Sequence, residues 1–164
     1  MRRTLTPRES QMLASLVTVD GFQSAVVEIV QLMNDRCASS DYHLRVVYGA
    51  RTAEEQDRLY AQGRTTAGPI VTRARAGESA HCYAAAADLA LCLDRSGAWL
   101  PGDHPAWGVL AAIVRARGVI TGSDFKNFAD RAHVELRGWT ARARMGSLSL
   151  WHGAPATGAR GGTP

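Results

Sequence analysis

Two histidines and one aspartate give the sequence the donor groups of a metal site. His81 is followed seven residues later by Asp88, and His133 lies far downstream with Asp130 three residues before it. Asp88 interrupts a run of alanines and leucines, where a carboxylate is costly to bury unless a cation or hydrogen bonds compensate it. Two imidazoles, one carboxylate ligand and a spare carboxylate as base match what catalytic Zn²⁺ requires. Either pair alone is common, so the interpretation depends on all four residues.

Glu135, two residues after His133, adds a further carboxylate to the pair formed by Asp130 and His133. If His133 begins a strand, the side chain two residues later lies on the same face of the sheet.

The elements that position these residues can be predicted from periodicity. Apolar residues at helical spacing predict a helix over residues 21–37, and alternation over residues 43–48 predicts a strand. Thr52 followed by Glu55 is a capping-box pattern, which predicts a helix over residues 53–62.

The second half of the chain is predicted to form loops, short strands and one more helix. Residues 63–79 are expected to form a long surface loop, and long loops in compact domains are often functional. The apolar run 84–93 fits a buried strand or a short helix, and the turn after it favours a hairpin. A helix over residues 105–118 and strands at 119–120 and 133–136 complete the prediction. The fold class is α+β, with a small, mainly antiparallel sheet flanked by helices.

Composition narrows the classes of partner. The 164 residues carry a formal net charge of +4, which fits either a solvated basic surface or attraction to a polyanion. Basic residues are not interleaved with aromatic ones, so a nucleic-acid partner is not expected. Three cysteines without CxxC spacing argue against a disulfide framework and fit a reducing compartment.

The length of the chain and the composition of its two ends predict a single soluble domain. We expect a single domain over residues 1–152, with the motifs in residues 43–137, a flexible tail over residues 153–164, and a monomer. The first residues are basic, but polar residues interrupt them before an apolar run begins, so no secretory signal is expected. No stretch is long enough for stable insertion in a membrane.

The motifs together resemble the zinc D,D-carboxypeptidase and L-alanyl-D-glutamate endopeptidase family, which includes VanY-like peptidases and many phage endolysins. The matching positions are Ser79-Ala80-His81 with Asp88, Asp130 with His133 and Glu135, Gly49-Ala50-Arg51-Thr52, Glu55-Gln56, Leu59-Tyr60 and Gln62-Gly63-Arg64-Thr65. The order of the four segments along the chain carries the resemblance, which covers about residues 48–136. It implies the hedgehog/D,D-peptidase type of α+β fold, with Zn²⁺ at the sheet.

The resemblance also implies roles. His81, Asp88 and His133 would ligate Zn²⁺, and Asp130 would move a proton from the attacking water to the leaving amine. Arg51 would bind the substrate carbonyl and stabilise the developing oxyanion. Ser79 would contact the substrate or a neighbouring group, and Glu135 would orient a metal ligand, with a structural role equally open for both.

Three positions depart from the family pattern. An aromatic residue often stands just before the second histidine, where this chain has Arg131-Ala132. Ala84 stands where the family usually has glycine, and its methyl group would be strained if a positive φ is needed there. Cys82 follows His81 where asparagine is usual. We expect His81 and Cys82 to lie next to each other on a strand, where neighbouring side chains point to opposite faces. Cys82 should therefore not bind the same metal ion as His81.

Several functions remain open at this point. The first is hydrolysis of the peptidoglycan stem peptide at L-alanyl-D-glutamate, by an endolysin made in the cytoplasm and released to the wall through a holin. A D-alanyl-D-alanine carboxypeptidase or endopeptidase is the alternative within the enzymes. A metal- or wall-binding module without turnover and, more weakly, a nucleic-acid-binding protein are the alternatives outside this class.

Overall fold

The computed structural model describes residues 3–153. The helices are α1 (Pro7–Ala14), α2 (Phe22–Arg36), α3 (Ala53–Ala61), α4 (Ala106–Ala116) and α5 (Trp139–Arg144); the strands are β1 (Tyr42–Tyr48), β2 (Ala86–Leu93), β3 (Ile120–Thr121) and β4 (His133–Glu135); the 3₁₀ helices are η1 (Val19–Gly21), η2 (Ala80–Tyr83) and η3 (Gly122–Asp124). Apart from Gly153, the predicted tail lies outside the described residues.

The four strands form one antiparallel sheet in the order β1-β2-β4-β3, which confirms the predicted α+β class. The run over residues 84–93, left open between strand and helix, forms β2. This strand lies between two neighbours and is buried along most of its length, so its apolar run is continuous rather than alternating. After the turn that follows β2, Trp99 pairs with Cys92, as the hairpin prediction required.

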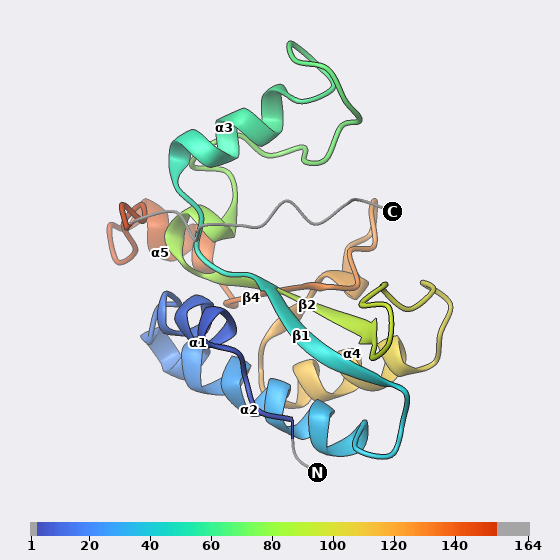
Figure 1. Ribbon diagram of the computed structural model, residues 1–164. Coiled ribbons are helices and arrows are strands. Elements are labelled where there is room, and N and C mark those ends of the chain that lie inside the picture. Colours follow the sequence, from blue (N-terminus) through green and yellow to red (C-terminus); the bar gives the residue numbers. More distant parts are fainter. Residues whose placement is uncertain (1–2, 154–164) are drawn as a thin grey trace.

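Helices α1, α2 and α4 lie on one side of the sheet (Figure 1). The predicted helix over residues 21–37 is α2, and its buried face consists of Phe22, Val26, Ile29, Val30 and Met33. This face packs against α4 and β1 to form the main core. Among the described residues, no helix combines the length and the apolar character needed to cross a membrane.

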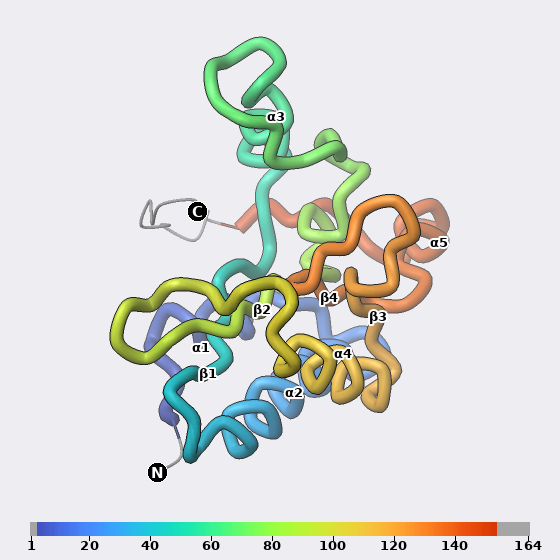
Figure 2. The backbone as a smooth tube through the Cα atoms, turned by 90° about the vertical axis from the view of Figure 1, so that its right-hand side faces the viewer, coloured from blue at the N-terminus to red at the C-terminus, as the bar shows by residue number. Residues whose placement is uncertain are grey.

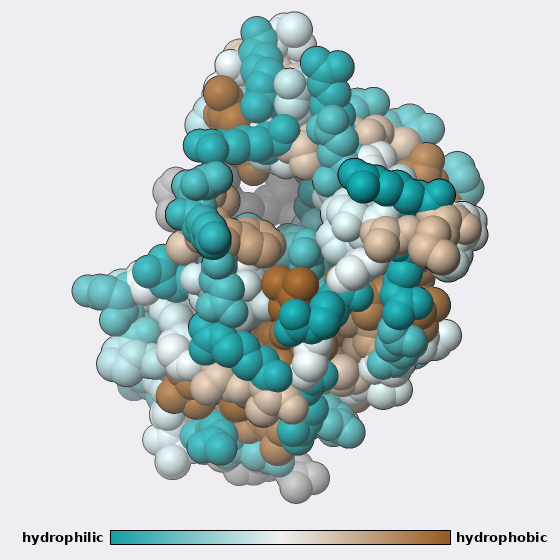
Figure 3. Space-filling model, turned by 180° about the vertical axis from the view of Figure 1, so that it is seen from behind, coloured by the Kyte–Doolittle hydropathy of each residue, from teal (hydrophilic) through white to brown (hydrophobic). Residues whose placement is uncertain are grey.

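Helix α3 and the loop that follows it project from the end of the sheet where β1 finishes (Figure 2). Half of the predicted capping box is present, because the Thr52 hydroxyl accepts a hydrogen bond from the Glu55 amide. The Glu55 carboxylate, however, accepts from the Tyr48 hydroxyl rather than from the cap backbone. Helix α3 is thereby tied to the last residue of β1. Between this projecting lobe and the body the surface is hollowed (Figure 3).

Helix α1 is an element that the periodicity did not reveal. It begins with a complete capping box at Thr6 and Glu9, with Pro7 in the first turn. The buried Glu9 carboxylate also accepts hydrogen bonds from Arg3 and from the Val46 amide of β1. The box has a clear sequence pattern, so this helix could have been predicted.

Candidate metal centre

The register of the sheet brings Asp88 and His133 together. Asp88 of β2 is directly opposite His133 of β4, and on its other side it is opposite Tyr48 of β1. A bulge between Val46 and Tyr48 shifts the register just before this point, and such bulges re-aim side chains. Tyr48, Asp88 and His133 therefore form a row across three strands.

His81 approaches the row from outside the sheet. The expectation that His81 and Cys82 lie on a strand is wrong: both belong to the 3₁₀ helix η2, and β2 begins only at Ala86. Ala84 ends η2 with a φ of 54° in the left-handed region. The tight turn lets the backbone reverse between His81 and Asp88, and it explains why a glycine would suit position 84.

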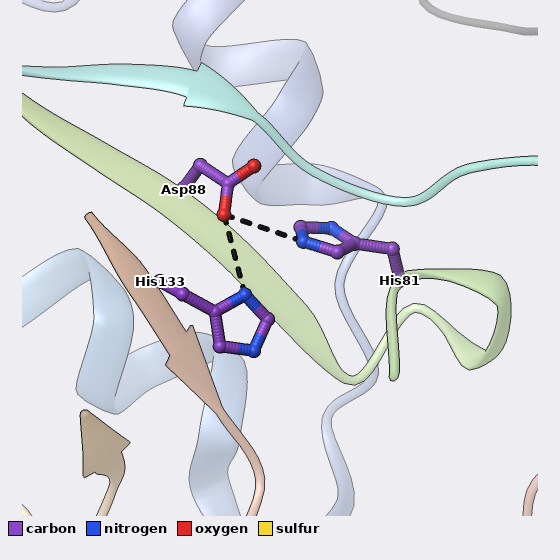
Figure 4. Close-up of side chains that lie close together, drawn as sticks. All are labelled: His81, Asp88 and His133. Atoms are coloured by element: carbon purple, nitrogen blue, oxygen red, sulfur yellow. Dashed lines mark hydrogen bonds and ion pairs between the residues drawn. The ribbon is translucent and has the colours of Figure 1, made fainter. Parts of the chain in front are cut away.

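The three side chains meet at distances that suit a metal ion. His81 Nε2 and His133 Nδ1 each lie 3.3 Å from Asp88 Oδ1 (Figure 4). One ligand atom from each residue lies within 4.8 Å of the other two. Tetrahedral Zn²⁺ with bonds of about 2.0–2.1 Å separates its ligand atoms by about 3.3–3.4 Å. The donor set and its spacing fit such an ion.

The second nitrogen of each imidazole has its own partner. His81 Nδ1 lies 2.7 Å from the Gly49 carbonyl oxygen, and His133 Nε2 lies 3.1 Å from Glu135 Oε2. Both oxygens can only accept, so these nitrogens carry protons, and the opposite nitrogens, which face Asp88, are the ones that could ligate a metal ion. Hydrogen bonds of this kind fix the tautomer and orientation of metal-ligating histidines.

The carboxylates around the cluster create a negative environment that favours a bound cation. Burial alone would raise the pKa of Asp88, but the charge of His81 and the hydrogen bond from His133 hold this pKa well below its usual value. Burial would lower the pKa of His133, whereas hydrogen bonds to Asp88 and Glu135 raise it to about 10. An imidazole between two carboxylates thus holds a proton strongly, and a divalent ion meets the same electrostatic need.

Asp130 lies beside the cluster rather than in it. Burial, and then the charge of Asp88, raise the pKa of its carboxyl group. Its backbone oxygen accepts from the His133 amide, and its own amide donates to Gly122. A side chain at Gly122 would place its Cβ 2.3 Å from the Asp130 oxygen and 3.0 Å from the His133 Cβ. Only glycine permits this approach, which sets Asp130 next to His133.

Arg51 is held at the edge of the row. Its backbone amide donates to the His81 carbonyl oxygen, and its guanidinium carbon lies 4.3 Å from the centre of the Tyr48 ring. Nη1 donates to Gln56 at 2.7 Å. The side chain is only 8% exposed, and its buried Nε has no hydrogen-bond partner in the described part of the chain.

Ser79 and Cys82 flank His81 differently. Ser79 precedes η2 without capping it and is partly exposed. Cys82 is fully buried, and burial raises the pKa of its thiol. Among the described residues, the group that could hold a metal ion does not include Cys82.

Comparison with known proteins gives related sequence and fold. The chain is 41% identical over 98 residues to the peptidoglycan L-alanyl-D-glutamate endopeptidase CwlK of Bacillus subtilis, covering 56% of this chain and 59% of that protein. The L-Ala D-Glu endopeptidase ChiX of Serratia marcescens has a similar fold, with a TM-score of 0.51 and 18% identity, over 85% of this chain and 95% of ChiX. The resemblance to this endopeptidase family is confirmed. No family model matches the chain.

The chain spans 59% of the length of CwlK, one of the curated proteins to which it is similar. The similarity to ChiX concerns the fold alone, and it agrees with the predicted sheet flanked by helices.

Three contributors to the site had no predicted role. Tyr48 and Gln56 stand within the resembling segments, and both contact Arg51. A signal for Gln56 existed, since it is an amide on the same helical face as Leu59 and Tyr60. Gly122 had no signal, because its requirement arises only when the loop after η3 folds back and brings Asp130 and His133 against it.

Proposed function

We propose that the chain is a zinc-dependent peptidase that hydrolyses the L-alanyl-D-glutamate bond of peptidoglycan stem peptides. The observation that carries this proposal is the convergence of His81, Asp88 and His133, whose ligand atoms lie within 4.8 Å of one another. The setting supports it, because the chain resembles L-alanyl-D-glutamate endopeptidases in sequence and fold.

His81 Nε2, an Asp88 carboxylate oxygen and His133 Nδ1 would hold the Zn²⁺. Zinc with three protein ligands activates a water molecule at neutral pH and polarises the substrate carbonyl. Asp130 would accept the proton of that water and return it to the leaving amine. Its raised pKa supports this assignment, because a general base works best when its pKa approaches the working pH.

Arg51 would bind and stabilise the oxygen of the scissile carbonyl. Its support is the place of the guanidinium against Tyr48 at the edge of the row, together with a buried Nε that has no hydrogen-bond partner among the described residues, which is unusual for a buried donor. Tyr48 and Gln56 fix the guanidinium, so little reorganisation is needed when charge develops. Ser79 would contact the substrate from the turn before His81.

A digest of intact peptidoglycan tests the proposal. Purified protein loaded with Zn²⁺ should generate new N-terminal D-glutamate, detected by mass spectrometry of the products, while His81→Ala should not. Released D-alanine would instead assign a carboxypeptidase. An intact wall after prolonged incubation with the zinc-loaded protein would refute both activities.

The proposal extends to an endolysin role, with release through a holin. Its support is the resemblance to a family rich in phage endolysins, and the net charge of +4 favours approach to an anionic envelope. Expression in a bacterial host should cause lysis only when a holin is produced as well. Lysis at the same rate without a holin would contradict this mode of release.

A further inference from the structure

The fully buried side chain of Gln56 joins the metal centre to the loop after α3. Its Oε1 accepts from Arg51 Nη1 at 2.7 Å, and its Nε2 donates to the Ala74 carbonyl oxygen at 2.7 Å and to Thr72 Oγ1 at 3.3 Å. Arg64 also donates to the Thr72 carbonyl oxygen. The backbone on both sides of residue 73 is therefore fixed relative to Arg51.

Arg73 stands between these two anchored residues with its side chain exposed. In the described part of the chain its guanidinium has no ion pair or hydrogen bond, and its one aromatic contact is with Phe128, whose ring centre lies 5.7 Å away. Arg64 and Arg75 of the same loop instead lie against Tyr60. Arg73 is thus a positioned cation whose charge is unpaired.

The contact with Phe128 places Arg73 near the metal centre. Phe128 belongs to the loop between η3 and β4, and Phe125 of that loop lies 5.7 Å from the His133 ring, centre to centre. Both phenylalanines are unusually open for apolar residues, at 38% and 61% exposure. Two loops therefore meet beside the cluster, one with exposed aromatic rings and the other with a free guanidinium.

We propose that Arg73 binds a carboxylate of the stem peptide on the leaving side of the scissile bond, with Phe125 and Phe128 covering the adjoining methylene groups. This assignment rests on the proposed function. A D-glutamyl residue has two carboxyl groups and only one can continue the peptide, so the other remains as a charge beside the leaving amine. A guanidinium binds carboxylates through paired hydrogen bonds, and its fixed backbone limits the entropy lost on binding.

Synthetic peptides test the assignment with four substrates. Each carries acyl-L-alanyl-D-glutamyl followed by one residue, with the free D-glutamyl carboxyl and the C-terminal carboxyl present as acid or amide in all combinations. With zinc-loaded wild type, amidation of the recognised carboxyl should raise KM about three- to tenfold, the range for a partly exposed charged hydrogen bond. Whichever amidation has this effect identifies the carboxylate that Arg73 binds.

For the peptide with both carboxyl groups free, Arg73→Ala should raise KM by the same factor that amidation does in wild type and leave kcat within about twofold. In this variant, amidation of the recognised carboxyl should no longer change KM. Arg73→Lys should restore part of the discrimination. Arg58→Ala is the matched control, because it removes one exposed charge from α3 and should keep the full effect. If Arg73→Ala discriminates acid from amide as wild type does, the assignment is wrong while the peptidase remains. A wild type that cleaves none of the four peptides overturns the proposed function and this assignment with it.

Discussion

The metal cluster is built from two kinds of structure. Asp88 and His133 are held by direct pairing of β2 with β4, so the sheet register alone sets them opposite each other. His81 and Asp130 come from turns, where His81 bonds to Gly49 and Arg51, and Asp130 bonds to Gly122 and His133. The sheet thus gives the site a rigid base, while the turns bring a third ligand and a base to it. Substitutions in the two parts should have different consequences.

The largest effect is expected in the sheet. Asp88→Asn removes the charge that both imidazoles face, and we expect Zn²⁺ content to fall from one per chain to a small fraction. Activity should fall about a thousandfold or more, because the metal's stabilisation of the transition state is worth several kcal/mol. Metal analysis and peptidoglycan digestion measure this, with circular dichroism as the control for folding. Full zinc content in the variant would show that the sheet does not provide the ligand.

Substitution of Asp130, the proposed base on a turn, should reduce activity without loss of the metal. Asp130→Asn keeps the shape of the side chain but cannot accept a proton, so activity should fall about a hundredfold or more while zinc stays bound. Parallel measurement of turnover and zinc content checks this. Loss of zinc together with activity would mean that Asp130 supports the cluster instead of acting as a base.

The same residue predicts the acid side of the pH profile. Burial and Asp88 raise the pKa of Asp130, and a base must be deprotonated to act, so activity should be present above this pKa and fall as the pH drops through it. The midpoint in kcat/KM should lie above the usual aspartate value of about 3.9. Zinc content must be followed over the same range, because protonation of the histidine ligands also releases metal. A midpoint at or below the usual value, with zinc still bound, would contradict the assignment.

A substitution at Glu135, also in the sheet, should have a smaller effect on zinc binding than Asp88→Asn. It lies on the same strand as His133 and accepts from the nitrogen that faces away from the ligand position. Glu135→Ala should weaken zinc binding about tenfold or more, the usual effect of removing such a partner. Glu135→Gln keeps an acceptor and should recover much of the affinity. Competition with a chelator measures both variants, and equal affinity in all three proteins would leave Glu135 without a positioning role.

The division between sheet and turns also marks what the sequence could predict. His133 and Glu135 lie two residues apart in one short strand, so their common face follows from the period of two. The position of Asp88 opposite His133 depends on the register of β2 with β4, and the continuous apolar run of β2 does not reveal that register. The sequence predicts a strand at η2, because four residues with little regular pattern precede the apolar run. The roles of Gly122 and Gln56 depend on how their loops fold back onto Asp130 and Ala74, which no local pattern records.

The smallest expected effect concerns the turn that carries His81. Ala84 has a φ of 54°, whereas its neighbour Ala85 does not have a positive φ, and both are buried. A left-handed conformation costs an L-residue about 1–2 kcal/mol, and glycine avoids this at an entropic cost of about 0.5–1 kcal/mol. Ala84→Gly also loses a buried methyl group worth about 0.8 kcal/mol, so the three contributions nearly cancel and the free energy of unfolding should change by less than about 0.5 kcal/mol.

The matched control is Ala85→Gly, which relieves no strain and loses a buried methyl group, so it should destabilise the protein by about 1 kcal/mol or more. Urea denaturation of the two variants and wild type, all with the same zinc loading, gives the comparison. A loss of stability that is smaller by about 1 kcal/mol or more at Ala84 than at Ala85 would show that the turn before β2 stores strain that the strand itself does not. If both glycines destabilise the protein equally, the left-handed turn is not strained, and the burial of its methyl group outweighs the backbone preference.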